Sequence, residues 1–359
     1  MDATGNAMRA AIVGIAATVL DPLEAALFRA HPPAGVILFR RNIESPSQLR
    51  LLVDALRQVL PPGAVLMVDQ EGGRVARLRP PHWQAHPSAG DIGARAPAEA
   101  LRAAWLTGAL IGLECAEAGF DVVCAPVLDL RFAGADAVIG DRAFAETAGE
   151  VARLGRAMAA GLLAAGIQPV GKHAPGHGRA TLDSHLALPI VAADDLDADL
   201  LPFAANADLP WMMTAHIVYP AWDALRPATL SPTVIREIIR GRCGYRGLLV
   251  SDDLAMQALD GAPAARATAA LAAGCDIALY CPGDMAATRE VLAAVPALSD
   301  AAVARLAAAR ALAASHRLAL DGLALAAERA DLLRAPAMNL SKAGRCPDPP
   351  GAKPLDLNI

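Results

Sequence analysis

Residues 65–74, VLMVDQEGGR, place a short run of apolar side chains directly before a polar turn that contains two glycines. Similar short apolar runs recur along the chain, separated by longer stretches rich in alanine and leucine. Runs that are short and apolar throughout are typical of strands buried on both faces of a parallel sheet. The expected strands are residues 11–16, 36–39, 65–69, 122–125, 169–172, 211–215, 248–251 and 276–280.

The stretches between these strands have helical patterns, as in residues 45–60, 97–118, 147–165 and 232–240. Ser45, Pro46 and Gln48 predict an N-cap, a first-turn proline and a capping box. Strands and helices that alternate eight times predict a TIM-type (β/α)8 barrel. A doubly wound open sheet is the alternative fold.

We expect the barrel to form a single domain over residues 1–335. Two connections, residues 72–97 and 173–194, are too long for turns and are expected to be lids or binding loops. Residues 336–359 are rich in proline and have no helical period, so we expect a disordered tail.

The composition limits the function. The 359 residues are 55% hydrophobic and carry a formal net charge of −5, which argues against a nucleic-acid partner because such binding needs a basic surface. Six scattered cysteines without a C-x-x-C pair predict a reducing compartment and neither a disulfide nor a metal role. We also expect a monomer that needs no cofactor.

Residues 10–20 form an apolar run that could serve as the core of a signal peptide. The preceding region contains Asp2 and only one basic residue, Arg9, so a first barrel strand is the preferred interpretation. No stretch reaches the length of apolar residues that a membrane-spanning helix needs. These observations predict a cytoplasmic protein without a membrane partner.

Polar residues follow the expected strands where a parallel barrel places its active site, at the carboxyl ends. They are Asp69 after the third strand, Asp129 and Arg142 after the fourth, Lys172 and His173 at the fifth, His216 at the sixth and Asp252 and Asp253 at the seventh. Structural roles stay open for some. Asp252 or Asp253 could cap the next helix, Lys172 could pair with Asp69, Asp129 or Asp252, and His216 could be a core histidine.

The least ordinary segment is GKHAPGHG at residues 171–178, followed by Asp183-Ser184-His185. It brings three histidines, a lysine and an aspartate into fifteen residues. An aspartate two residues before a histidine can reach the ring and fix its tautomer, as a carboxylate does in hydrolase triads. This segment therefore predicts that Asp183 orients the His185 ring, and a polar, solvated loop is the alternative.

At these residues the chain resembles the single-domain bacterial β-N-acetylglucosaminidases of glycoside hydrolase family three. The resemblance covers roughly residues 8–295, and Ala174 stands where these relatives usually have phenylalanine. The motifs that carry it are VDQEGGRV at 68–75, APVLD at 125–129, GKHxPGHG with DSH at 171–185, SDDL at 251–254, ILFxRN at 37–42 and AGCD at 273–276.

The resemblance implies a retaining exo-enzyme in which Asp252 is the nucleophile and His185, oriented by Asp183, is the general acid and base. A histidine, with an ordinary pKa of ~6.5, suits both tasks near neutral pH. The substrate would be N-acetylglucosamine on peptidoglycan-derived anhydromuropeptides in cell-wall recycling. The residues implied to hold the sugar's hydroxyls and acetamido group are Asp69, Arg77, Arg142, Lys172 and His173.

Other functions remain open at this point. A class-I aldolase would use Lys172 as a Schiff-base lysine. A metal-dependent hydrolase would use the histidines with Asp252, but the usual H-x-H or H-E-x-x-H spacing is missing. A sugar-binding protein without catalysis leaves Asp252 unexplained, and a β-glucosidase is the closest competitor.

Overall fold

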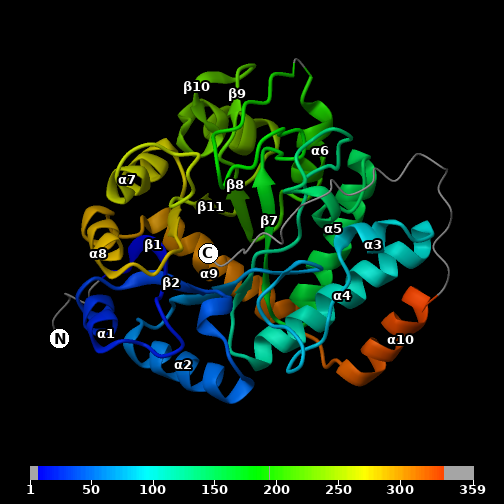
Figure 1. The fold of residues 1–359 in the computed structure, drawn as a ribbon, viewed down its shortest axis with the longest axis horizontal. Coiled ribbons are helices and arrows are strands. Elements are labelled where there is room, and N and C mark those ends of the chain that lie inside the picture. Colours follow the sequence, from blue (N-terminus) through cyan, green and yellow to red (C-terminus); the bar gives the residue numbers. More distant parts are fainter. Residues whose placement is uncertain (1–6, 194, 335–359) are drawn as a thin grey trace, which may run out of the picture.

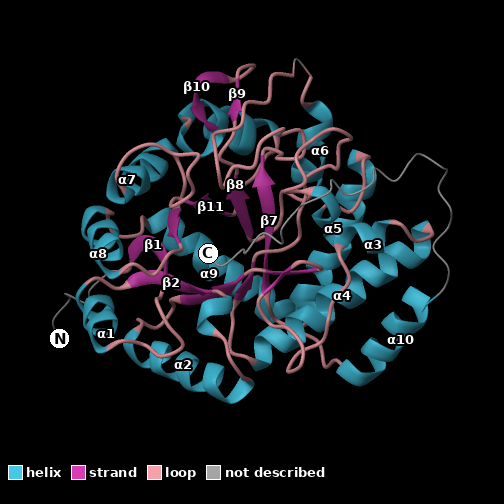
Figure 2. Ribbon diagram, in the orientation of Figure 1, coloured by secondary structure: helices cyan, strands magenta, loops and turns pink. Residues whose placement is uncertain are grey.

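The computed structural model describes residues 7–193 and 195–334, which form a closed barrel of eight parallel strands surrounded by helices (Figures 1 and 2). The strands are β1 (Arg9–Gly14), β2 (Pro33–Leu38), β3 (Val65–Val68), β6 (Val122–Val123), β7 (Gln168–Ala174), β8 (Trp211–Thr214), β11 (Leu248–Asp253) and β12 (Ile277–Tyr280). Their order around the barrel follows the sequence, and β12 closes the ring by pairing with β1. The predicted TIM-type barrel is confirmed, and the open sheet is wrong.

Helices form the outer layer, as Figure 2 shows. They are α1 (Pro22–Ala30), α2 (Pro46–Val59), α4 (Pro97–Glu117), α5 (Ala148–Ala164), α6 (Asp197–Ala205), the π-helix η4 (Val234–Arg242), α7 (Pro263–Ala273), α8 (Met285–Ala294), α9 (Asp300–His316) and α10 (Gly322–Arg334). Short 3₁₀ turns follow three of the strands: η1 (Arg40–Asn42), η2 (Gly140–Arg142) and η3 (Ala228–Leu230). The helix α4 packs most closely on α5 and also carries α10.

Both faces of the barrel strands are buried, as the continuous apolar runs predict. Along β3, Val65 and Met67 belong to the apolar cluster inside the barrel, whereas Leu66 and Val68 pack toward the helices. This alternation is what a closed parallel barrel requires, since successive side chains point to opposite faces. The polar side chains therefore collect where the strands end.

The two long connections contain local structure beside the barrel. The first carries a hairpin of β4 (Gln70–Gly72) and β5 (Val75–Ala76), followed by the short helix α3 (Ala89–Gly93). The second continues from β7 through turns and reaches Val218 through a bridge from Ile190. Val218 begins another hairpin, β9 (Val218–Tyr219) with β10 (Asp223–Pro227).

The start of α2 confirms two local predictions and corrects a third. The Ser45 hydroxyl accepts the backbone N–H of Gln48 at 3.2 Å, and Pro46 is the first helical residue. The predicted capping box is wrong, because the side-chain oxygen Oε1 of Gln48 accepts the backbone N–H of Glu44 and not that of Ser45. The amide of Gln48 also donates to the carbonyl of Thr18 at 2.6 Å, so this side chain ties α2 to the β1–α1 connection.

Residues 10–20 include most of β1 and the loop that leads to α1, as the barrel interpretation predicts. Asp21 caps α1, and its side chain accepts the N–H of Leu23 while Glu24 completes a capping box. Within residues 7–193 and 195–334, no helix has the length and apolar character to cross a membrane. The expected tail at residues 336–359 lies outside the described residues.

Candidate active site

A cavity of about 960 Å³ opens at the carboxyl ends of the barrel strands. The structure brings all the residues predicted for the site to its wall, although they come from distant parts of the chain. These residues are Asp69, Arg77, Arg142, Lys172, His173, Asp183, His185 and Asp252.

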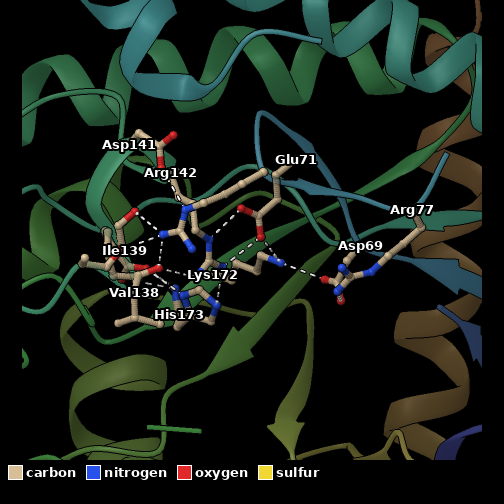
Figure 3. Close-up of polar contacts among 12 residues, drawn as sticks. Asp69, Glu71, Arg77, Val138, Ile139, Asp141, Arg142, Lys172 and His173 are labelled. Carbon is tan, nitrogen blue, oxygen red and sulfur yellow. Dashed lines mark hydrogen bonds and ion pairs between the residues drawn. The ribbon is translucent and has the colours of Figure 1, made fainter. Parts of the chain in front are cut away.

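One side of the cavity is a continuous chain of ion pairs (Figure 3). Arg77 lies 3.2 Å from Asp69, and the other oxygen of Asp69 lies 2.9 Å from the Lys172 ammonium. Lys172 contacts Glu71 at 2.6 Å, and Glu71 binds Arg142 through two bonds of 2.8 and 2.9 Å. Three cations thus share two carboxylates, which leaves one positive charge and donor groups for a ligand.

These ion pairs fix the protonation states. Burial alone would raise the pKa of Asp69, but the charges of Lys172 and Arg77 hold it well below its usual range. Burial would lower the pKa of Lys172, yet Asp69 and Glu71 raise it above the ordinary lysine value. Lys172 is therefore a permanent ammonium, whereas a Schiff-base lysine needs a neutral amine. This geometry disfavours the aldolase interpretation.

Asp129 binds two histidines of the histidine-rich turn and holds it in place. Its fully buried carboxylate lies 2.7 Å from Nδ1 of His173 and accepts the backbone N–H of His177 at 2.6 Å. Burial would raise the pKa of Asp129, but His173 and His177 lower it. With Nδ1 held by Asp129, Nε2 of His173 faces Arg142 at 3.4 Å, on the ion-paired side of the cavity.

Asp183 and His185 form the expected pair. Nδ1 of His185 lies 2.6 Å from the Asp183 carboxylate, which also accepts the His185 backbone N–H at 2.9 Å. A ring whose Nδ1–H is held by a carboxylate presents Nε2 for proton transfer. The His185 carbonyl accepts the N–H of Gln257, so this loop lies against the connection after β11.

A hydrogen bond ties the same loop to the turn that follows β7. Nε2 of His177 lies 2.9 Å from the hydroxyl of Ser184, the residue between Asp183 and His185. Burial, followed by the nearby charge of His173, lowers the pKa of His177 to about 4, so its ring is neutral near pH 7. We call the His177–Ser184 contact the loop strap.

Asp252 lies near the end of β11, and the adjacent Asp253 has a structural role instead. Its carboxylate accepts the N–H of Asp253 at 2.8 Å. Burial would raise the pKa of Asp252, but His173 and His216 outweigh it and keep the carboxylate ionised. Asp253 instead accepts the N–H groups of Ala255 and Cys281, and burial raises its pKa to about 6.

His216 is a satisfied core histidine, one of the interpretations left open. Its Nδ1 lies 2.8 Å from the Thr229 hydroxyl, and Nε2 donates to the carbonyl of Asp253 at 2.9 Å. Because both nitrogens are occupied, His216 supports the end of β11 and has no free lone pair for a metal. Among the described residues, no group of three or more His, Cys, Asp or Glu side chains is placed to bind a metal ion.

Sequence reasoning assigned no role to Glu71 or Ser184, and it named Asp129 only as a strand-end residue that could pair with Lys172. Strand alternation is the signal that could have found Glu71: the Gln70 side chain bonds to the backbone of Arg77 and Leu78, and residues 69 and 71 face the other way. Asp129 stands at the end of the APVLD motif but acts through the turn at residues 173–177. Nothing in the sequence signals the partner of Ser184.

Comparison with known proteins identifies relatives along most of the chain. Residues 22–313 match the family model of the glycosyl hydrolase family 3 N-terminal domain. A β-hexosaminidase of Alkalilimnicola ehrlichii is 45% identical over 281 residues, which are 75% of this chain and 80% of that protein. A β-hexosaminidase of Bordetella pertussis is 40% identical over 285 residues, with 77% and 80% covered.

Solved structures agree with these matches. The crystal structure of NagZ from Neisseria gonorrhoeae in complex with N-trifluoroacetyl-D-glucosamine superposes with a TM-score of 0.81 at 32% identity and covers 91% of this chain and 98% of that one. A β-N-acetylhexosaminidase from Beutenbergia cavernae superposes with a TM-score of 0.71 at 29% identity, with 89% and 96% covered.

Proposed function

The chain belongs to glycosyl hydrolase family 3, and from this premise we propose that it is a retaining exo-β-N-acetylglucosaminidase with Asp252 as its nucleophile. As a member of the family it is a glycoside hydrolase, of the β-hexosaminidase type. One observation carries the finer proposal. Asp252 and the Asp183–His185 pair line the same cavity as the ion-paired residues suited to hold a sugar.

In the first half of the reaction, a carboxylate oxygen of Asp252 attacks the anomeric carbon. His185 carries protons on both nitrogens and gives the Nε2 proton to the leaving oxygen as the glycosidic bond breaks. The Nδ1–H remains hydrogen-bonded to Asp183 at 2.6 Å, and this carboxylate stabilises the charged ring before the proton is transferred. The products are a glycosyl ester on Asp252 and the free aglycone.

In the second half, neutral His185 takes a proton from water through Nε2 while the water oxygen attacks the anomeric carbon. The ester bond to Asp252 breaks, and the carboxylate leaves with its electron pair. The two displacements together retain the β configuration. The low pKa of Asp252 favours it as a leaving carboxylate.

The chain of ion pairs suits the sugar itself. Asp69 offers carboxylate oxygens, and Lys172 and Arg142 offer charged N–H groups, all preordered before a ligand arrives. Charge-assisted hydrogen bonds to hydroxyl and acetamido groups are about twice as strong as neutral ones. We propose that these residues, with Arg77 and His173, bind terminal N-acetylglucosamine.

For the physiological role we propose removal of N-acetylglucosamine from peptidoglycan-derived anhydromuropeptides by a cytoplasmic monomer. Relatives named as β-hexosaminidases and the fit to NagZ support the sugar specificity. The five described cysteines are all unpaired, which agrees with a reducing compartment.

The test compares hydrolysis of 4-nitrophenyl N-acetyl-β-D-glucosaminide with that of the matching β-D-glucoside. We expect a preference of about 100-fold or more for the acetamido sugar, because a site built to bond a polar group rejects the analogue without it. A preference for the glucoside would instead support the β-glucosidase alternative.

Two variants test the assignments of roles in the same assay. Asp252→Ala is expected to lose about 1,000-fold or more in kcat, while the exposed Asp260→Ala on the same connection serves as control. His185→Ala is expected to lose the pH dependence of kcat near neutrality, with the exposed His316→Ala as control. Near-wild-type turnover in Asp252→Ala would refute the nucleophile assignment.

A further inference from the structure

Two arginines at the mouth of the cavity have no part in the reaction described above. Arg40 opens η1 directly after β2, and Arg79 follows the β4–β5 hairpin after β3, the strand that pairs with β2. Both side chains line the same cavity as Asp252, and both are exposed. They therefore lie outward from the buried ion pairs on one side of the entrance.

Neither guanidinium forms a salt bridge with a carboxylate of the described residues. Arg40 donates to the carbonyl of Ile43, and Arg79 donates to the carbonyls of Ala76 and Arg74. Both side chains are thus fixed by the main chain while part of each guanidinium stays free. The neighbouring cavity arginines differ, since Arg74 pairs with Asp141 at 3.0 Å and Arg77 pairs with Asp69.

The positive charges are close enough to affect one another. Burial, followed by the charges of Arg77 and Arg40, lowers the pKa of Arg79. Of the acidic groups on the β6–α5 connection that line the cavity, Asp141 pairs with Arg74, whereas Asp136 accepts the N–H of Val138 at 2.7 Å and keeps its negative charge. On the β2–β3 side, the charges of Arg40 and Arg79 have no described carboxylate within 4.0 Å, the limit for a salt bridge.

N-acetylglucosamine carries no charge, so the sugar held at the bottom does not neutralise the charges of Arg40 and Arg79. In an exo-enzyme the leaving group extends from the anomeric carbon toward the mouth. We propose that Arg40 and Arg79 form a subsite for a carboxylate on the aglycone, and that the enzyme selects N-acetylglucosaminides with an acidic aglycone. This inference rests on the proposed function and names the chemistry of its leaving group.

The physical basis is the fit of a planar guanidinium to a carboxylate, to which it donates two parallel N–H bonds. Main-chain anchoring of both side chains reduces the conformational entropy lost on binding. Because the site is exposed to solvent, salt weakens the attraction.

The experiment uses two disaccharides that differ only in charge. Each has N-acetylglucosamine β-1,4-linked to N-acetylmuramic acid, one with the free lactyl carboxylate and one with the carboxamide. We expect the wild-type enzyme at low ionic strength to show kcat/KM about 3- to 10-fold higher for the acid, and the ratio to approach one in about 0.5 M salt.

The double variant R40Q/R79Q is expected to bring the ratio near one at low salt, and each single variant to lower it partly. R50Q removes an exposed arginine outside this cavity and is expected to keep the wild-type ratio. A wild-type ratio near one, or an unchanged ratio in R40Q/R79Q, overturns the subsite. If the enzyme cleaves no N-acetyl-β-glucosaminide, including the nitrophenyl one, the proposed function fails instead.

Discussion

Glu71 is the side chain on which the sugar-binding cations depend. It is buried, contacts Lys172 at 2.6 Å and holds Arg142 through both oxygens. Burial would raise its pKa, but Arg142 and Lys172 lower it, so it is ionised at neutral pH. We propose that Glu71 positions these cations and does not itself touch the sugar.

Glu71→Gln keeps the volume and removes the charge. Because three cations then share the single carboxylate of Asp69, we expect the free energy of unfolding to fall by about 3 kcal/mol. Misplaced donors should raise KM for the N-acetyl-β-glucosaminide and lower kcat/KM by about 10-fold or more. Urea unfolding and steady-state kinetics measure both quantities.

Glu328→Gln is the matched control, since Glu328 also binds an arginine, Arg102, through two bonds of 2.7 Å but on the exposed surface. Exposed pairs contribute about 1 kcal/mol or less. Equal losses of stability in the two variants would contradict the role assigned to Glu71.

His177 should make the stability depend on pH. Its pKa falls from 6.5 to about 4 on burial in the folded protein, so the unfolded chain binds more protons between these values. Its contribution is complete above pH ~6.5 and is lost as the pH falls toward 4. Between pH 7 and 5 we expect His177→Gln to lose about 2 kcal/mol less of unfolding free energy than the wild type does. Parallel pH profiles of the two proteins, by urea unfolding, would disprove this.

At the scale of elements, the loop strap joins the turn after β7 to the loop that carries Asp183 and His185. Ser184→Ala removes the hydrogen bond of 2.9 Å between the Ser184 hydroxyl and Nε2 of His177. We expect kcat to fall by about 10-fold with little change in KM, because the proton donor loses its position while the sugar site stays intact.

Ser231→Ala serves as the control for this change. It also removes a hydrogen bond of a buried serine, 2.7 Å from Asp223, but outside the cavity, so it should leave kcat unchanged. A rise in KM with unchanged kcat in Ser184→Ala would contradict this role, because it would show that the strap acts on sugar binding.

The strands were predictable from the sequence because short, continuous apolar runs are typical of strands buried on both faces. Their ends were less so: β6 has only two residues, and β7 and β11 continue to Ala174 and Asp253. The added residues are mostly polar, and whether they continue a strand depends on backbone pairing with the neighbouring strands. The Gln48 side chain shows the same limit, since its partner Thr18 lies 30 residues away.

The site was predictable residue by residue but not contact by contact. Strand-end position pointed to Asp69 and Lys172, yet 103 residues separate them and three carboxylates were possible partners. Barrel closure decides between those partners, and the pattern of apolar runs does not determine side-chain geometry across the rim.

At the scale of the whole molecule, the last described helix contacts a connection that lines the cavity. Arg329 of α10 is buried, lies 2.6 Å from Nδ1 of His86 and donates to Gln84, and both of these residues line the cavity. His86 in turn contacts Glu114 of α4 at 2.9 Å through Nε2. This cluster holds the connection between β5 and α4 in place.

Arg329→Ala is expected to lower the free energy of unfolding by about 2–3 kcal/mol, because it leaves buried polar partners unpaired. Arg334→Ala on the same helix removes only an exposed pair with Asp331 and should change it by about 0.5 kcal/mol or less. Thermal and urea unfolding distinguish the two. Similar effects would mean that α10 is held by apolar packing alone.

The central claim is the covalent intermediate on Asp252, and trapping it tests that claim most directly. With a nitrophenyl leaving group, His185→Ala should form the glycosyl ester rapidly and hydrolyse it slowly, because departure of nitrophenolate needs little acid catalysis whereas water lacks its base. Mass spectrometry of the digested protein after rapid acid quench is predicted to find one N-acetylglucosaminyl group on the peptide and side chain of Asp252. An adduct on Asp253 or elsewhere, or turnover without a burst and without an adduct, would contradict the account.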